Sequence, residues 1–216
     1  MKIPLILCNP TNYRTNRKQN IKYIVIHYTA NNGDTAKGNC NYFANNSNLG
    51  ASAHYFVDEN EVWQSVPDNN CAWHCGGENG YKHNECRNDN AIGIEICSRK
   101  DNSDNYYFLD ASVNNAIELT KYLMTKYNID TNHVIRHFDT SGKICPAPFV
   151  KNESAWINFK NRLEVNQVEP WKQQIMDKAV KYGLITPNTH NANDMASKWF
   201  MLAVIMNLLE KYILKK

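Results

Sequence analysis

Short apolar stretches rich in β-branched residues recur along the first two thirds of the chain. The first clear one covers residues 22–29 and reads KYIVIHYT. Its length and composition predict a buried β-strand, because helices usually need ten residues or more. Stretches of the same kind predict further strands at residues 54–57, 62–66, 91–97 and 133–137.

Residues 112–127 follow a different period. Their apolar side chains recur every three or four positions, at Val113, Ala116, Ile117, Leu123, Met124 and Tyr127. This spacing predicts an α-helix with Ser112 as its N-cap residue. Strands interleaved with at least one long helix predict an α/β fold, with a mixed central β-sheet flanked by helices.

A polar stretch separates this region from the C-terminal part of the chain. We expect a main domain at residues 1–160, a linker at residues 161–170 that ends in Glu169-Pro170, and a small helical domain at residues 171–216. Its first helix is predicted to end at Gly183, in the position after the helix that glycine favours. The apolar positions of its two predicted helices are Trp171, Ile175, Ala179 and Tyr182, and then Trp199, Leu202, Ile205, Met206, Leu209 and Ile213. A hairpin of under about 50 residues is marginal alone, so we expect it to dock on the main domain or to form a homodimer.

Composition and charge narrow the class of protein. The chain has 216 residues, of which 43% are hydrophobic and 21% are charged, as in a soluble globular protein. With 24 Lys and Arg against 21 Asp and Glu, the net charge is +3, so no nucleic-acid partner is expected. The longest apolar run is far too short to span a membrane, which takes about 20 residues.

The N-terminal segment resembles a signal peptide for only a few residues. Residues 1–8 are mostly apolar, but Asn9, Pro10 and a polar run follow without a small-residue cleavage site. We expect this segment to form a first strand or an extended arm, and the protein to be synthesised in the cytoplasm without a signal peptide. The seven cysteines are therefore expected to be mostly buried thiols, with Cys71 and Cys75 the pair open to oxidation outside the cell.

Three residues with metal-ligand chemistry lie at or just after predicted strand ends. His27 follows the apolar run of the first strand, His137 follows the last strand, and Cys145 lies in the loop beyond it. Imidazole and thiolate are ligands that zinc prefers, and three protein ligands leave a fourth position for water, as in catalytic sites. Each residue alone is more typical of packing, so the prediction depends on their occurring together.

Two charged residues strengthen this interpretation. Glu95 lies in the apolar strand at residues 91–97, where a carboxylate is costly unless it is paired or takes part in chemistry. Lys143 precedes Cys145 by two residues and places a positive charge near the metal. The alternative is a solvated strand-edge glutamate and a solvated loop lysine.

Five separated motifs then resemble those of a known family. They are residues 24–30, 52–57, 72–76 and 90–95, and the pair of segments 136–139 and 143–146. In this order they resemble type-2 N-acetylmuramoyl-L-alanine amidases, zinc enzymes related to the peptidoglycan recognition proteins. The resemblance covers roughly residues 20–160, and within the family the chain looks most similar to phage or prophage endolysins of Gram-positive hosts.

The resemblance implies a reaction and the residues that carry it. The reaction is hydrolysis of the amide bond between N-acetylmuramic acid and the L-alanine of the stem peptide. By position in the motifs, His27, His137 and Cys145 match the zinc ligands, Glu95 the general base and Lys143 the basic residue beside the metal. Some relatives use a tyrosine where this chain has Ala53, which favours Glu95 as the base.

Further motif residues are expected to contact the substrate, bacterial peptidoglycan: Tyr28, Trp73, His74 and Asn90. His54 is expected to be either a partner of a ligand or, preferably, a core histidine. The C-terminal helices are expected to bind the cell wall or to dimerise. We expect the protein to act on the wall after release through a membrane hole, with a cytoplasmic recycling amidase as the alternative.

Two other functions remain open at this point. A non-catalytic peptidoglycan-binding module could share the fold, although such relatives commonly lack the cysteine ligand. A cysteine hydrolase using Cys145 and His137 would leave His27 and Lys143 unexplained.

Overall fold

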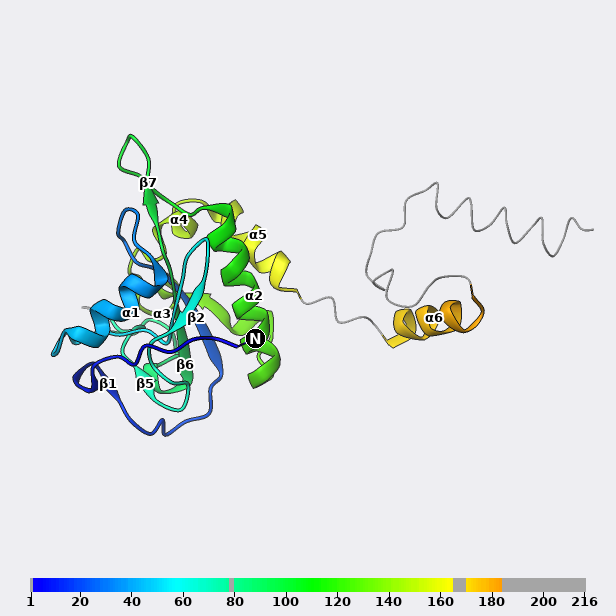
Figure 1. Ribbon diagram of the computed structural model, residues 1–216, viewed down its shortest axis with the longest axis horizontal. Coiled ribbons are helices and arrows are strands. Elements are labelled where there is room, and N and C mark those ends of the chain that lie inside the picture. Colours follow the sequence, from blue (N-terminus) through cyan, green and yellow to red (C-terminus); the bar gives the residue numbers. More distant parts are fainter. Residues whose placement is uncertain (1, 78–79, 165–169, 184–216) are drawn as a thin grey trace, which may run out of the picture. The chain divides into compact units, whose positions relative to one another are not determined.

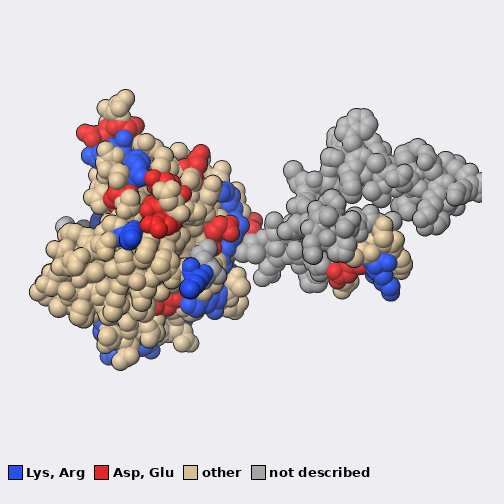
Figure 2. All heavy atoms as spheres, viewed as in Figure 1, with Lys and Arg blue, Asp and Glu red and all other residues tan. Residues whose placement is uncertain are grey.

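The computed structural model describes residues 2–77, 80–164 and 170–183 (Figure 1). The chain divides into two compact units, Met1–Val165 and Asn166–Lys216. The larger unit contains a five-stranded sheet in the order β4-β3-β6-β2-β9. Charges of both signs are interspersed on the face of this unit shown in Figure 2, in keeping with the nearly balanced composition.

The sheet is mixed, as the sequence predicts. Its strands are β2 (Tyr23–Tyr28), β3 (Tyr55–Val57), β4 (Val62–Gln64), β6 (Ala91–Ile96) and β9 (Val134–Arg136). β2 runs parallel to β6 and β9, β3 runs parallel to β6, and β4 pairs with β3 in the antiparallel sense. Parallel strands are covered on both faces, and this explains the unbroken apolar run at the centre of β2.

Helices cover both faces of the sheet (Figure 1). On one face, α2 (Asp110–Tyr127) and α5 (Glu153–Leu163) pack on Ile24, Ile26 and the isoleucines of β6 in the main core. On the other, α1 (Ala36–Asn45) packs on Phe56 of β3 through Ala36 and Cys40. The alternation of side chains along each strand therefore assigns every other residue to one helical layer.

Shorter elements complete this unit. They are η1 (Pro10–Asn12), β1 (Tyr13–Arg14), β5 (Cys71–Ala72), η2 (Asn88–Asn90), β7 (Arg99–Lys100), β8 (Tyr106–Tyr107), η3 (Thr131–His133), α3 (His137–Ser141) and α4 (Ala147–Val150). The N-terminal segment is an extended arm beside β4, because the Ile6 amide donates to the Gln64 carbonyl and the Gln64 amide to the Pro4 carbonyl. All seven cysteines are buried free thiols, and Cys75 and Cys86 pack in one small cluster.

Several predicted boundaries are wrong. α2 begins at Asp110, so Ser112 is a buried residue of the first turn and not the N-cap. β9 ends at Arg136 because Asp139 accepts a hydrogen bond from the Arg136 amide at 2.8 Å, and this capping contact starts α3 at His137.

The main unit also extends past the predicted boundary at residue 160. α5 continues to Leu163, which is fully buried in the core, so the first three residues of the predicted linker are helical. In the second unit, α6 (Pro170–Lys181) is followed by Gly183 in the left-handed region at φ +68°, as predicted. The second predicted helix, with Trp199 and Ile213, lies outside the described residues. No described helix is long and apolar enough to cross a membrane.

Candidate metal centre

The topology brings His27, Glu95 and His137 to one edge of the sheet. His27 and Glu95 are register partners near the carboxyl ends of the parallel strands β2 and β6. His137 directly follows β9, which is parallel to β2 on its other side. The carboxyl ends of parallel strands are where open α/β sheets commonly form sites.

Cys145 completes a group of three ligands. The ligand atoms of His27, His137 and Cys145 all lie within 4.8 Å of one another, and the Cys145 Sγ is 3.7 Å from the His27 Nδ1. The three residues are 1%, 3% and 3% exposed. Two imidazoles and a thiol in this arrangement have the donor chemistry and the spacing of a metal site.

Polar contacts from the segment at residues 74–76 involve the same nitrogen, Nε2, in both histidines. The His137 Nε2 lies 2.8 Å from the Gly76 carbonyl oxygen, and the His27 Nε2 lies 3.0 Å from the His74 Nδ1. In each ring the Nδ1 is the atom that remains for a metal. Burial lowers the pKa of His137 to about 4 and that of His27 as well, so both are neutral near pH 7 and able to ligate.

Glu95 is placed to exchange protons beside this group. Its Oε1 lies 3.9 Å from the His27 Nδ1, and its Oε2 is buried without a hydrogen-bond partner among the described residues. Burial raises the pKa of Glu95 to about 8, against the opposing effect of the Lys143 charge and with a smaller contribution from Asp34. A carboxyl group whose pKa lies near neutrality can accept and return a proton.

Lys143 is an exposed residue of the cavity wall, and its positive charge affects the pKa values of the three ligands and of Glu95. It lowers the pKa values of His27, Glu95, His137 and Cys145, although burial dominates in each case and raises the pKa of the Cys145 thiol. The positively charged Lys143 can therefore stabilise negative charge that develops on a substrate at the metal site.

A cavity of about 880 Å³ opens above these residues. Tyr28 and Trp73, both predicted substrate contacts, are partly exposed and line it. Its walls also include Asn31, Asp34, Thr35, Asn39, Tyr42, Phe43 and Ser52. The mixture of aromatic and amide side chains suits a ligand that carries both sugar and peptide groups.

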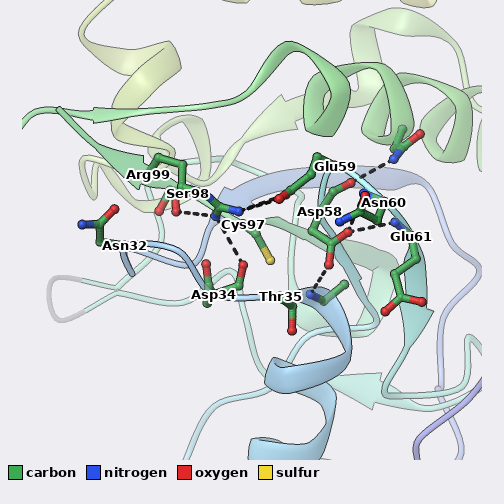
Figure 3. A network of polar contacts seen from close by, with 12 residues as sticks. Asn32, Asp34, Thr35, Asp58, Glu59, Asn60, Glu61, Cys97, Ser98 and Arg99 are labelled. Atoms are coloured by element: carbon green, nitrogen blue, oxygen red, sulfur yellow. Dashed lines mark hydrogen bonds and ion pairs between the residues drawn. The ribbon is translucent and has the colours of Figure 1, made fainter.

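A polar network holds the wall formed by the start of α1 (Figure 3). Asp58 is 1% exposed, and its carboxylate accepts from the amides of Ala36 at 2.7 Å and of Asn60 and Glu61 at 2.8 Å. Arg99 pairs with Glu59 at 2.8 Å and donates to the Asp34 carbonyl oxygen at 3.3 Å. These contacts connect the segments before α1 and after β3 and β6 into one support for the cavity.

Of the other two predicted substrate contacts, Asn90 lies away from the cavity, and His74 borders it but is nearly buried. Asn90 does not line the cavity: it precedes β6, at the opposite end of the strand from Glu95, and its side chain bonds to the Arg87 amide and the Glu85 carbonyl. His74 borders the cavity but is only 9% exposed and lies against His27. His54 is a fully buried core histidine, whose Nδ1 accepts from the Gly93 amide at 3.0 Å.

Sequence reasoning missed the residue that anchors the segment behind the ligands. The Asn88 Oδ1 accepts from the amides of His74 and Cys75, both at 2.9 Å, and from the Cys75 thiol at 3.1 Å. Asn88 lies two residues before Asn90 in a polar run without periodicity, so the only available signal was its closeness to the motif at residues 90–95.

Comparison with known proteins gives one consistent result. The family profile described as N-acetylmuramoyl-L-alanine amidase matches residues 17–148. The amidase CwlL of Bacillus licheniformis is 35% identical over 153 residues, which cover 67% of this chain and 41% of CwlL. The chain therefore spans about two fifths of the length of this curated relative.

Solved structures agree in fold. The structure of PlyL superposes with a TM-score of 0.63 at 30% identity, covering 77% of this chain and 99% of PlyL. A mutant endolysin from Bacillus subtilis superposes with a TM-score of 0.62 at 32% identity, covering 76% of this chain and 99% of that one.

Proposed function

The chain belongs to the N-acetylmuramoyl-L-alanine amidase family, and from this we propose that it hydrolyses the amide bond between N-acetylmuramic acid and L-alanine in bacterial peptidoglycan. The observation that carries the proposal is the convergence of five residues on one cavity. Three buried ligands, a carboxyl group with a raised pKa and a cationic side chain occur there together.

Zinc is the metal that this site fits best. In a tetrahedral zinc site, a nitrogen at about 2.1 Å and a sulfur at about 2.3 Å lie about 3.6 Å apart. The separation between the His27 Nδ1 and the Cys145 Sγ is 3.7 Å. A set of two imidazoles and one thiolate leaves one position open, which is the arrangement of a catalytic site.

The chain's own residues then have distinct tasks. When bound, zinc supplies a Lewis acid that activates water and polarises the scissile carbonyl. Glu95 accepts the proton of the attacking water and passes it to the departing alanine nitrogen. Lys143 stabilises the negative charge that develops on the carbonyl oxygen. Tyr28 and Trp73 line the cavity in which the sugar and peptide would lie.

The two alternative functions are less well supported. A non-catalytic module has no use for a buried carboxyl group beside a complete ligand set. A cysteine hydrolase needs a thiolate beside a base, but burial raises the pKa of Cys145, and the imidazole in contact with its sulfur is that of His27 rather than His137.

The proposed substrate also indicates where the protein acts and what it binds. Peptidoglycan lies outside the cytoplasmic membrane, so we propose that the protein acts there after release. The second unit, Asn166–Lys216, would bind the wall or form a homodimer.

Digestion of purified Gram-positive cell walls tests the reaction. We expect new amino-terminal alanine without new reducing sugar ends, loss of this release on chelation, and recovery on addition of zinc. Glu95→Gln, which keeps the size of the side chain, should bind zinc and release little alanine. Binding to walls without new termini in zinc-loaded protein would contradict the enzyme and support a recognition module.

A further inference from the structure

His74 lies behind the metal centre, and the proposed reaction leaves it without a task. Its Nδ1 is 3.0 Å from the His27 Nε2, and the two rings meet edge to face. On its other side the ring packs in the same way against the fully buried His54. With 9% of its surface exposed, His74 offers little area to a substrate.

Gly93 makes the position of this ring possible. A Cβ atom at residue 93 would lie 2.6 Å from the His74 Cγ and 2.8 Å from its Nδ1, far inside van der Waals contact. Gly93 is two residues before Glu95 on β6 and therefore faces the same side of the sheet. The missing side chain leaves the space in which His74 packs on the strand.

The hydrogen bond between the two rings can run in only two directions. A neutral imidazole has one proton, so either His27 or His74 donates. If a metal takes the lone pair of the His27 Nδ1, the proton of that ring is on Nε2 and His27 is the donor. His74 must then accept through Nδ1 and keep its own proton on Nε2, an atom that is buried without a partner among the described residues.

We propose that His74 is a positioning residue for the metal: its Nδ1 accepts the Nε2 proton of His27 and so holds the His27 Nδ1 toward Cys145. The inference rests on the zinc site proposed above. It gives the two ligand histidines equivalent supports from one short segment, because the Gly76 carbonyl accepts from His137. Asn88 fixes this segment through the amides of His74 and Cys75.

Paired variants at residue 74 test the inference by zinc affinity. His74→Leu fills the space without an acceptor, whereas His74→Asn keeps an amide oxygen close to the position of Nδ1. Loss of a partner that orients a ligand typically costs 10-fold to 100-fold in metal affinity. We expect a loss of that size for H74L and recovery of most of it for H74N, measured by competition with a chromogenic zinc chelator. His54→Asn is the control, because His54 touches His74 and no ligand, and it should bind zinc as the wild type does.

A second measurement needs no variant. Side-chain ¹⁵N NMR of the zinc-loaded wild-type protein should show His74 neutral, with its proton on Nε2 and Nδ1 accepting a hydrogen bond. The cobalt-substituted protein adds an absorption spectrum that reports ligand geometry, which should change in H74L and be restored in H74N. Thermal unfolding of the metal-free variants separates loss of the fold from loss of affinity.

The outcomes distinguish this inference from the proposed function. Wild-type zinc affinity in folded H74L, or a His74 proton on Nδ1 in the zinc-loaded protein, would overturn the positioning role. A raised KM with unchanged zinc affinity would also overturn it and support the substrate contact. A wild-type protein that binds no zinc would instead contradict the proposed function.

Discussion

Lys143 shows how one exposed side chain can act on a buried group. Its charge lowers the pKa values of the three ligands and of Glu95, although Lys143 is itself an exposed residue. Because its side chain makes no hydrogen bond or ion pair among the described residues, its removal should affect the reaction and not the stability. A substitution of Lys143 therefore tests its role in the reaction without a change in stability.

We predict that Lys143→Met lowers kcat by about 100-fold to 1000-fold, the usual effect of one lost donor to a developing oxyanion. KM and the thermal midpoint should change little, because the ground-state amide carries no full charge for the lysine to bind. Release of amino-terminal alanine, followed over a range of soluble fragment concentrations, measures both constants.

Lys82→Met is a matched control, since Lys82 is exposed near Gly142 but does not line the cavity. This control should retain wild-type turnover. An equal loss in both variants would show that Lys143 contributes only to the general positive charge of this surface.

The buried histidines give the metal-free protein a pH dependence. Burial and the neighbouring Arg17 lower the pKa of His54 to about 3, against 6.5 for an ordinary histidine. Between these two values the unfolded chain binds a proton that the folded chain does not, so the free energy of unfolding falls as the pH drops from 6.5 toward 3. His54 alone contributes up to about 1.4 kcal/mol for each pH unit in this window.

We therefore predict that His54→Asn flattens this dependence. The asparagine Oδ1 can still accept from the Gly93 amide, as the His54 Nδ1 does. Urea unfolding of the chelator-treated wild type and variant at pH 7 and pH 5 measures the difference. Parallel losses of stability in the two proteins would show that His54 does not supply this proton linkage.

At the scale of elements, the segment between β5 and η2 depends on one amide side chain. The Asn88 Oδ1 accepts hydrogen bonds from the backbone amides of His74, which contacts His27, and of the next residue, Cys75. An unpaired buried donor costs about 1–3 kcal/mol. Asn88→Leu leaves both without an acceptor, whereas Asn88→Asp retains an oxygen in their place.

We predict that N88L lowers the free energy of unfolding by about 2–4 kcal/mol, from two amides at that cost each with partial compensation by water, and weakens zinc binding. N88D should keep most of both properties. Denaturant titrations and the chelator competition assay measure them, and wild-type zinc affinity in N88L would show that the segment holds its shape without this anchor.

The strands β2 and β6 show how much of the site can be predicted from the sequence. The apolar run of β2 and the alternation in β6 predicted both strands, and the observed parallel register then places His27 beside Glu95. Local patterns also predicted the mixed sheet and the helix that became α2. Such features depend on residues close in the sequence, or on motifs whose order is fixed by the strands.

The residues whose surroundings the sequence did not predict have a physical feature in common. Ser112, Asn90 and His74 were judged by residue type and by closeness to a motif, but their surroundings depend on contacts with distant segments. Asn90 caps a turn at the opposite end of β6 from Glu95. The ring of His74 packs on Gly93, in space that a side chain there would fill. No periodicity in the sequence shows that the ring of His74 will pack where Gly93, on the next strand along the chain, lacks a Cβ atom.

At the scale of the whole molecule, the site is confined to one unit. His27 through Cys145 all lie in Met1–Val165, and the family match ends at residue 148. The superposition covers 99% of the PlyL structure but only 77% of this chain, so a structure about three quarters as long as this chain has the same fold. We therefore expect the first unit to fold, and to hold its ligand residues in place, without the part that begins at residue 166.

We predict that a chain truncated after Val165 folds, binds zinc and cleaves soluble muramoyl peptides within about twofold of the full-length kcat/KM. If the second unit binds the wall, tethering raises the local concentration of enzyme at its substrate, and its removal should lower the rate on intact walls by tenfold or more. The ratio of the two rates is the informative quantity, because damage to the catalytic unit lowers both together. A ratio unchanged by truncation, with a halved mass in light scattering, would assign the second unit to dimerisation instead, since a lost dimer contact removes a partner copy without removing affinity for the wall.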